Sequence, residues 1–375
     1  MKLNSLVIRQ FRNYEDVEIN FHPDINIIYG KNAQGKTNLL EAISYLSTGS
    51  SFRETSEQKL GNWGSDFFFI EGNLLRNGEE NTLSAGYQLK KKLWKKNGNN
   101  CRKISEIVGF LHTVVFTPED LEIVKKGPEQ RRHFLNREML QIFPGYHHHL
   151  NTYKKALLQR NNLLKQIEFG HINSEIERDL LLAPWEEQMA ASGAVITLKR
   201  ASILKDLNEI SAEIHSYLSG GEEELKLTYE SALPFIDEET AVSDVENQLL
   251  QIFKESRNDD LRRGFSTTGP HRDDFNIEIN GVDARSYGSQ GQQRTAALSI
   301  KLSEIELVNN LKGYYPILLL DDVLSELDQN RRAALIKMAL NKSQIFITST
   351  DIDRGLLELP DSDYNKYQIV NGNIL

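Results

Sequence analysis

The stretch Ile25-Asn26-Ile27-Ile28-Tyr29-Gly30-Lys31-Asn32-Ala33-Gln34-Gly35-Lys36-Thr37 decides the fold of this chain. Its second part is a complete phosphate-binding loop, G-x-x-x-x-G-K-T, and its first part is an apolar run that predicts a strand. A helix is expected from Lys36 to about Leu46, and its N-terminus adds a positive end to the loop. Lys36 is expected to reach the β- and γ-phosphates of ATP, and Thr37 to offer its hydroxyl to Mg²⁺. Every residue from Gly30 to Thr37 is therefore a candidate nucleotide contact.

A second motif, far along the chain, supplies the carboxylates that such a loop needs. Ile317-Leu318-Leu319-Leu320 predicts a buried strand, and Asp321 and Asp322 follow it directly. A carboxylate at the end of a buried strand is typical of the magnesium side of the site, so Asp321 is the candidate Mg²⁺ ligand. Asp322 is then placed to polarise the attacking water as the catalytic base. The alternative, a strand-ending acidic turn, accounts less well for the Leu324-Ser325-Glu326-Leu327-Asp328 that follows.

One predicted helix separates this strand from a third motif, Ser289-Gln290-Gly291-Gln292. The order of the three motifs resembles the ATP-binding-cassette arrangement, in which the serine-glycine motif of one subunit covers the γ-phosphate held by the other. Ser289, Gly291 and Gln292 are accordingly candidate nucleotide contacts, with Ser289 acting catalytically in trans. The helix N-terminus behind them favours anions. Taken alone, the motif is an ordinary helix cap.

The predicted elements place the three motifs in one α/β lobe built from the two ends of the chain. Strands are expected at 3–9, 17–21, 66–75, 81–89, 113–116, 276–279, 317–320 and 345–347, with Asn-Gly turns at 77–78, 280–281 and 371–372. Two helical apolar stripes, along 146–167 and from Pro184 to about 217, predict an antiparallel helical hairpin. The expected division is an ATPase lobe of residues 1–118 and 265–375, with residues 119–264 as an inserted helical lobe.

Length and composition limit the class of protein. The chain has 375 residues, of which 39% are hydrophobic and 26% charged, enough for one large or two ordinary domains. No apolar run approaches the ~18 residues needed to cross a bilayer, and the first residues lack a secretory stretch, so a cytoplasmic protein with no membrane partner is expected. The single cysteine, Cys101, excludes an intramolecular disulfide. A net charge of -9 argues against a surface that is basic throughout, but not against a local basic patch.

Further motifs make the resemblance specific. The chain resembles the RecF family, bacterial recombination mediators related to the SMC-type chromosome ATPases. The matching segments run almost end to end in the expected order: 11–14 (Phe-Arg-Asn-Tyr), 30–37, 117–120 (Thr-Pro-Glu-Asp), 131–135, 268–274, 289–294 and 318–328. The resemblance implies an α/β fold: an ATP-binding-cassette-type, SMC- and RecF-like P-loop ATPase head with an inserted helical-hairpin lobe.

The resemblance also implies a function. RecF-like proteins are DNA-binding ATPases that form homodimers on ATP and act on duplex and gapped DNA without sequence specificity. They work with RecR and RecO, favour RecA loading, support replication restart and the SOS response, and turn ATP over slowly. The resemblance implies a nucleoid-associated location in the cytoplasm. It also places Arg12 among the nucleotide contacts.

Three positions depart from the broader cassette pattern and agree with RecF. Asp322 stands where a longer glutamate is usual, and Gln290 stands in place of the second motif glycine. Thr348-Ser349-Thr350 follow the strand at 345–347, where transporters carry a switch histidine. We therefore expect slow hydrolysis. The resemblance implies that DNA stimulates it and that ATP acts as a dimer switch.

Two basic clusters are candidates for DNA contacts. The first contains Lys90, Lys91, Lys92, Lys95, Lys96, Arg102 and Lys103 around Trp94, and the second contains Lys125, Lys126, Arg131 and Arg132. Cations neutralise phosphates and an aromatic ring supports an unpaired base, so both clusters are assigned to DNA. The alternative for each is a solvated face of an otherwise acidic protein.

The segment Gly269-Pro270-His271-Arg272-Asp273-Asp274 allows two interpretations. One is a metal site, although the spacing is too tight for the usual three-ligand sites. The favoured one is a structural turn that places His271 and Arg272 near the nucleotide or the dimer interface.

Three other functions compete with an ATP-gated DNA clamp. The nucleotide-binding subunit of a transporter predicts a switch histidine and a short helical subdomain. A structural SMC-like tether needs more heptads than residues 146–168 and 184–218 supply. A small-molecule phosphotransferase usually carries its carboxylates nearer the loop, and it has no use for Ser289 to Gln292.

Overall fold

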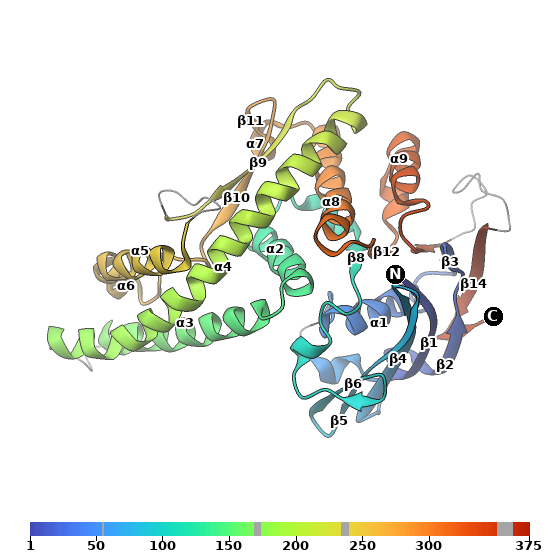
Figure 1. The fold of residues 1–375 in the computed structure, drawn as a ribbon, viewed down its shortest axis with the longest axis horizontal. Helices are drawn as coiled ribbons and strands as arrows, with labels where there is room; N and C mark the ends of the chain where they lie inside the picture. Colours follow the sequence, from blue (N-terminus) through green and yellow to red (C-terminus); the bar gives the residue numbers. More distant parts are fainter. Residues whose placement is uncertain (55, 169–173, 234–239, 351–362) are drawn as a thin grey trace. The chain divides into compact units, whose positions relative to one another are not determined.

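The computed structural model describes residues 1–54, 56–168, 174–233, 240–350 and 363–375 (Figure 1). These residues form two compact units. Unit 1 contains Met1–Glu122, Tyr217–Gly221 and Arg294–Leu375, and unit 2 contains Ile123–Ser216 and Glu222–Gln293. Within the described residues, no helix combines the length and the apolar character that crossing a membrane requires.

A mostly parallel sheet organises unit 1 and brings both ends of the chain together. Its strand order is β15-β14-β3-β13-β12-β8. In chain order the strands are β3 (Ile25–Tyr29), β8 (Thr113–Phe116), β12 (Ile317–Leu320), β13 (Ile345–Ser349), β14 (Tyr364–Val370) and β15 (Asn373–Ile374). β13 lies between β3 and β12 and pairs in parallel with both. The phosphate loop and the two carboxylates therefore leave the same end of the sheet, one strand apart, where open α/β sheets bind ligands.

A second, antiparallel sheet of unit 1 has the order β2-β1-β4-β5-β6-β7. Its strands are β1 (Lys2–Phe11), β2 (Tyr14–Asn20), β4 (Phe67–Arg76), β5 (Glu79–Gln88), β6 (Lys91–Lys96) and β7 (Asn99–Asn100). Helix α1 (Lys36–Thr48) follows the phosphate loop. Its Leu39, Ile43 and Leu46 share one hydrophobic core with residues of both sheets. Full burial of such a side chain stabilises a protein by about 1.5–3 kcal/mol, so this core anchors the helix that carries the loop.

The hairpin predicted over residues 66–89 is confirmed, because β4 and β5 pair antiparallel across the Asn77-Gly78 turn. Strand β6 was not predicted, since lysine has a low preference for strands and fills most of its positions. It pairs with β5 and turns Trp94 inward. Because side chains alternate along a strand, Lys91, Leu93 and Lys95 face outward together.

The remaining elements of unit 1 are short or follow the parallel sheet. They are helix α9 (Gln329–Ala339) and the 3₁₀ helices η1 (Glu57–Leu60), η2 (Ile104–Glu106), η3 (Pro118–Glu122) and η4 (Val323–Glu326). Helix α8 (Gln290–Lys312) begins in the last residues of unit 2 and continues in unit 1. Helix α8 is the helix that the sequence predicts between Ser289-Gln290-Gly291-Gln292 and the strand at 317–320.

Unit 2 is mainly helical. Its helices are α2 (Pro128–Ile142), α3 (Tyr146–Glu168), α4 (Glu175–Leu218), α5 (Val242–Glu255), α6 (Arg257–Arg263) and α7 (Ala284–Tyr287). The end of α3 packs on the start of α4 through Leu164 and Leu182, and Tyr153 lies beside Gly193 farther along, so the two helices run antiparallel (Figure 1). This pairing is the one that the apolar stripes predict. The link between them, near Gly170, lies outside the described residues.

Pro184 does not open the second long helix, contrary to the prediction. α4 begins at Glu175 and contains Pro184 in its interior. A proline there removes a backbone hydrogen bond and costs about 3 kcal/mol. Tertiary contacts on both sides offset this cost: Leu182 is buried, and Glu186 binds the guanidinium groups of Arg160 and Arg257. The helix therefore continues where its local sequence favours a start.

Unit 2 contains a small sheet with the order β11-β10-β9, and one domain boundary differs from the expected 264/265. Its strands are β9 (Leu225–Glu230), β10 (Asp274–Ile279) and β11 (Val282–Asp283), and β9, which was not predicted, pairs with β10 along its whole length. Residues 265–293, assigned to the ATPase lobe from the sequence, therefore belong to unit 2. The other boundary lies at 122/123, close to the expected 118/119.

Candidate nucleotide and magnesium site

The phosphate loop bends between the end of β3 and the start of α1. Gly30 and Gly35 have φ angles of 151° and 118°, in the region that favours glycine. Lys36 is buried, and its Nζ donates to the carbonyl oxygens of Gly30 at 2.7 Å and Lys31 at 3.2 Å. The ammonium group therefore lies over the backbone of the loop, where the motif requires a cation for the phosphates.

Thr37 and Asp321, 284 residues apart in the chain, meet at the end of the parallel sheet. The Thr37 hydroxyl donates to Asp321 Oδ1 at 2.9 Å, and the Thr348 hydroxyl donates to the same oxygen at 2.9 Å. Burial raises the pKa of the Asp321 carboxyl, while these two hydrogen bonds lower it. The carboxylate thus has a fixed position beside the first turn of α1.

These two side chains fit a magnesium ion. Mg²⁺ binds hard oxygen ligands, keeps several waters, and is usually held by one or two carboxylates together with substrate phosphates. A threonine hydroxyl and a buried carboxylate within hydrogen-bond distance of each other offer such oxygens next to the phosphate loop. Thr37 and Asp321 would hold the ion, which would neutralise phosphate charge.

Asp322, the candidate base, has an unusual backbone. Its φ of 52° lies in the left-handed region, which few residues other than glycine, asparagine and aspartate adopt. Its N–H donates to the Thr348 hydroxyl at 2.8 Å, and its carbonyl oxygen accepts from Ser325 at 2.6 Å. Backbone strain of this kind is frequent at functional sites.

Thr348 is a site residue to which the sequence assigned no role. One hydroxyl bridges the side chain of Asp321 and the backbone of Asp322. Thr348 lies at the end of the neighbouring strand β13, where transporters carry a switch histidine. The sequence signal for this role is a threonine near the end of β13, the strand that lies between β3 and β12.

Arg12 supports the helix that follows the phosphate loop. Its guanidinium donates to both carboxylate oxygens of Glu41 in α1, at 2.8 and 2.7 Å, and to the carbonyl of Lys59 at 3.0 Å. Glu41 is fully buried, so this bidentate pair neutralises a charge that would otherwise be costly. Arg12 is thereby held against the loop helix, and its direct contact with nucleotide stays a prediction.

Ser289 and Gln292 form a reciprocal cap at the start of α8. The Gln292 N–H donates to Ser289 Oγ at 3.2 Å, and the Ser289 N–H donates to Gln292 Oε1 at 2.8 Å. The amide of Gln292 also donates to Glu223 at 2.9 Å. Ser289 and Gly291 are exposed, so the cap presents them to solvent at a helix N-terminus. The helix-cap interpretation holds within one chain, and a role in trans requires a second chain.

The lysine cluster on β6 is exposed, but Trp94 is not available to DNA. Lys90, Lys91 and Lys95 are exposed, whereas Lys92 pairs with Glu57. Lys96 lies over the ring of Phe110, 3.9 Å from its centroid. The Trp94 ring is buried and stacks on Tyr45, so the proposed support for a base by Trp94 is wrong.

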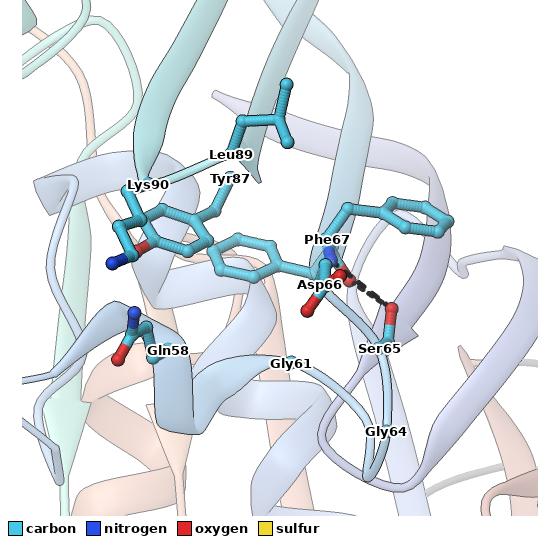
Figure 2. Close-up of a pocket in the computed structure, with 10 residues that line it drawn as sticks. Gln58, Gly61, Gly64, Ser65, Asp66, Phe67, Tyr87, Leu89 and Lys90 are labelled. Carbon is cyan, nitrogen blue, oxygen red and sulfur yellow. Dashed lines mark hydrogen bonds between the residues drawn. The ribbon is translucent and has the colours of Figure 1, made fainter.

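A surface pocket of about 500 Å³ lies beside the turn between β5 and β6. Figure 2 shows the Tyr87 ring near Gln58 and Lys90, with Leu89 at the turn, while the Phe67 ring points away from Tyr87. Phe67 is 40% exposed. Phe67 pairs across from Gln88 and so lies on the same face of the sheet as Lys91, whereas Tyr87 lies on the opposite face, with Lys92. Phe67 is therefore an exposed aromatic ring on the face of the exposed lysines, which Trp94 is not.

Arg131 and Arg132 form a structural cluster rather than a free basic patch. Arg131 is buried and binds both oxygens of Asp274 at 2.7 Å. Arg132 donates to the carbonyl oxygen of Asp273 at 2.9 Å, and burial lowers the pKa of its guanidinium. The assignment of Arg131 to DNA is corrected, because its charge is neutralised inside unit 2. Arg132 is partly exposed, and its contact with DNA stays a prediction.

The segment around His271 organises a buried polar network in unit 2. Tyr153 lies 2.7 Å from His271 Nδ1, and His271 Nε2 lies 3.1 Å from the carbonyl oxygen of Ser266. A carbonyl oxygen only accepts, so Nε2 carries the proton and Nδ1 accepts from Tyr153. Both ring nitrogens are thus engaged, which rules out the metal interpretation for His271. Burial lowers the pKa of His271 to about 4.

This lowered pKa predicts a loss of stability in mild acid. Between pH 6.5 and 4 the unfolded chain binds a proton that the folded ring refuses, so the free energy of unfolding falls as the pH falls. The contribution of His271 between pH 7 and 5 is about 2 kcal/mol. Urea unfolding at both pH values, for the native chain and His271→Gln, measures it.

His271→Gln is a close test, because its amide can accept from Tyr153 and donate to Ser266 as the imidazole does. Burial raises the pKa of Asp273, but this group titrates in both proteins and drops out of the difference. An equal acid loss in the two proteins would contradict the prediction.

The fold and the site define a P-loop ATPase of the ATP-binding-cassette type, built like the head of SMC proteins. The family model described as RecF/RecN/SMC N terminal domain matches residues 2–359. The DNA replication and repair protein RecF of Halalkalibacterium halodurans is 39% identical over 374 residues, covering 100% of this chain and 99% of that protein. RecF of Staphylococcus aureus is 40% identical over 376 residues, covering 100% of both. The chain belongs to the RecF family.

Solved structures agree. The recombination mediator protein RecF with ATPrS, of the RecFOR pathway, superposes with a TM-score of 0.88 at 36% identity, covering 99% of this chain and 97% of that one. The corresponding RecF–ATP structure gives 0.86 at 36% identity, covering 100% and 96%. An SMC head bound to the winged-helix domain of ScpA gives 0.54 at 14% identity, covering 100% and 96%, and shows likeness of fold alone.

Proposed function

We propose that this chain is an ATP-switched DNA-binding protein of recombinational repair. The observation that carries the proposal is the hydrogen bond between Thr37 and Asp321, which joins the phosphate loop to the carboxylate strand across 284 residues. Full-length relatives named for DNA replication and repair, and a RecF structure solved with ATP, support the choice among P-loop ATPases.

The site residues have distinct parts in this proposal. The loop backbone and Lys36 bind the β- and γ-phosphates, while Thr37 and Asp321 hold Mg²⁺. Asp322 orients the attacking water and takes its proton. Ser289 and Gly291 of a second copy cover the γ-phosphate, so that ATP joins two chains into a homodimer. Hydrolysis is slow because the shorter Asp322 replaces the usual glutamate. DNA stimulates it, and ATP acts as a switch.

DNA binding is assigned to the exposed side of strand β6 and the adjoining turn. Lys90, Lys91 and Lys95 are exposed and contribute positive charge to an acidic chain, which suits phosphates without reading sequence. Duplex and gapped DNA are the proposed substrates. RecR and RecO are the proposed protein partners, with RecA loaded indirectly, since a similar RecF structure belongs to the RecFOR pathway.

The experiment that tests this function is the fluorescence anisotropy of a labelled gapped duplex, titrated with the chain in the presence and absence of Mg-ATP. Binding that requires Mg-ATP and weakens with salt is expected, because the homodimer joins two basic surfaces. Absence of binding under every condition would overturn the DNA assignment for the isolated chain.

Charge reversal at the exposed lysines gives a more local prediction. Lys91→Glu with Lys95→Glu is expected to weaken DNA binding by about tenfold or more near 0.1 M salt, and to reduce the salt slope by about two. Anisotropy titrations at several salt concentrations measure both quantities. Lys154→Glu with Lys155→Glu makes the same change of charge on the exposed face of α3 and is the matched control. Equal losses in both double variants would show a non-specific charge effect and contradict the assignment.

A further inference from the structure

One residue of the phosphate loop, Gln34, is held by segments from both ends of the chain. Its carbonyl oxygen accepts from Asn13 Nδ2 at 2.7 Å and from the N–H of Gly372 at 3.0 Å. Its side-chain Oε1 accepts from the N–H of Asn371 at 2.7 Å. The C-terminal turn therefore binds the loop residue through both its main chain and its side chain.

The contact between this turn and the loop leaves no spare room. A Cβ on Gly372 would lie 2.1 Å from the carbonyl oxygen of Asn13, and a Cβ on Gly35 would lie 2.6 Å from Asn13 Nδ2. At the other end of the loop, a Cβ on Gly30 would lie 2.4 Å from the carbonyl oxygen of Ile369 in β14. Gly30 therefore packs against the C-terminal hairpin. Gly35 packs against Asn13, which in turn contacts the hairpin at Gly372.

The geometry of a peptide bond gives this contact a consequence for phosphates. In a trans peptide, the C=O of Gln34 and the N–H of Gly35 point in opposite directions. Two donors hold the carbonyl toward Asn13 and Gly372, so the Gly35 N–H is held away from them. Phosphate-binding loops work by directing such N–H groups at the ligand.

We infer that the C-terminal hairpin, Tyr364–Ile374, is a positioning element of the nucleotide site. Its Asn371-Gly372 turn, acting through Asn13 and Gln34, sets the orientation of the loop amides, so nucleotide affinity depends on a segment more than 300 residues away in sequence. The inference rests on the proposed function, since it assumes that the loop binds ATP. By linkage, bound nucleotide stabilises the turn to the same extent.

The chain contains its own control for this inference. Asn77-Gly78 joins β4 to β5 as a two-residue turn with φ angles of 53° and 81°, and Asn371-Gly372 joins β14 to β15 in the same way with 49° and 76°. Among the described residues other than Gly78 and its two chain neighbours, no atom lies within 4 Å of a Cβ placed on Gly78. Alanine at either position has a strained left-handed backbone. Only at Gly372 does its Cβ also clash with Asn13, which holds Gln34 of the loop.

The test compares Gly372→Ala with Gly78→Ala in the full chain. Titration with a fluorescent ATP analogue in Mg²⁺ gives the affinity, and thermal unfolding gives the stability. We expect Gly372→Ala to weaken binding by about tenfold, as the loss of one or two hydrogen bonds implies, and Gly78→Ala to leave affinity unchanged. Hydrogen exchange of the Asn371 and Gly372 amides in the native chain is expected to slow when Mg-ATP is added.

The outcomes separate this inference from the function on which it rests. A native chain that does not bind Mg-ATP would refute the proposed function. A native chain that binds, with both variants binding equally well and with exchange at Asn371 and Gly372 unaffected, would overturn the positioning role. Should Gly372→Ala fail to fold, Asn13→Ala removes the donor to Gln34 without changing a left-handed glycine, and is expected to weaken ATP binding in the same direction. An unchanged affinity in that variant would also overturn the positioning role.

Discussion

Replacing Lys36 by methionine is expected to abolish ATP binding at millimolar nucleotide, with a loss in affinity of about a hundredfold or more. The side chain is 4% exposed, and its ammonium lies within hydrogen-bond distance of two loop carbonyls. Methionine keeps a long apolar stem but removes the charge that faces the phosphates, and hydrogen bonds to charged groups contribute about 1.5–3 kcal/mol each. Nucleotide titration measures the change directly.

The same variant tests the link between ATP and DNA. If DNA binding requires ATP-driven dimerisation, Lys36→Met is expected to bind a gapped duplex equally weakly with and without Mg-ATP. Lys254→Met, at an exposed position of α5, removes one positive charge elsewhere and serves as control. Native DNA binding by Lys36→Met would separate the DNA surface from the nucleotide switch and refute the gating part of the proposal.

Asp322→Asn is expected to keep ATP binding while lowering the hydrolysis rate by about a hundredfold or more, the usual contribution of a general base. Asparagine has the same shape and tolerates the left-handed backbone of this position, where φ is 52°. The change therefore removes the proton acceptor with little structural cost. Single-turnover hydrolysis gives the rate, and light scattering after gel filtration is expected to show a persistent ATP-bound dimer.

Asp321→Asn supplies the contrast for this experiment. That carboxylate is held by the hydroxyls of Thr37 and Thr348, and its loss is expected to weaken the binding of Mg-ATP itself. A normal hydrolysis rate in Asp322→Asn would show that another residue is the base. Equal defects in affinity for both variants would show that the two aspartates share one role in binding.

Local patterns predicted the parts of this protein that depend on a few neighbouring residues. The phosphate loop, the strand before Asp321 and the Asn-Gly turns each combine a repeat of apolar side chains with residues of special backbone freedom. The structure places each of them as an element of the expected kind. The assignment of Thr37 and Asp321 to one site also came from the sequence, because a carboxylate at the end of a buried strand is typical of the magnesium side of a phosphate-loop site.

Patterns failed where a side chain has a partner far away in the chain. Arg131 and Trp94 look like surface residues of basic segments, yet Asp274 neutralises one and Tyr45 covers the other. Pro184 has the local signature of a helix start, and contacts made by Glu186 keep it inside α4. Strand β9 was missed, and with it the unit to which residues 265–293 belong.

The identity of the chemical groups at the nucleotide site, and the family, follow from the sequence, since both depend on residue types in motifs that follow one another in a particular order along the chain. The contacts that hold the residues of that site in place do not follow from the sequence. Thr348 between the two aspartates, Glu41 against Arg12, and the Asn371-Gly372 turn against Gln34 exist only after folding. Each is a hydrogen bond between backbone or common polar groups, which occur throughout any sequence, so only their positions in space distinguish the pairs that form.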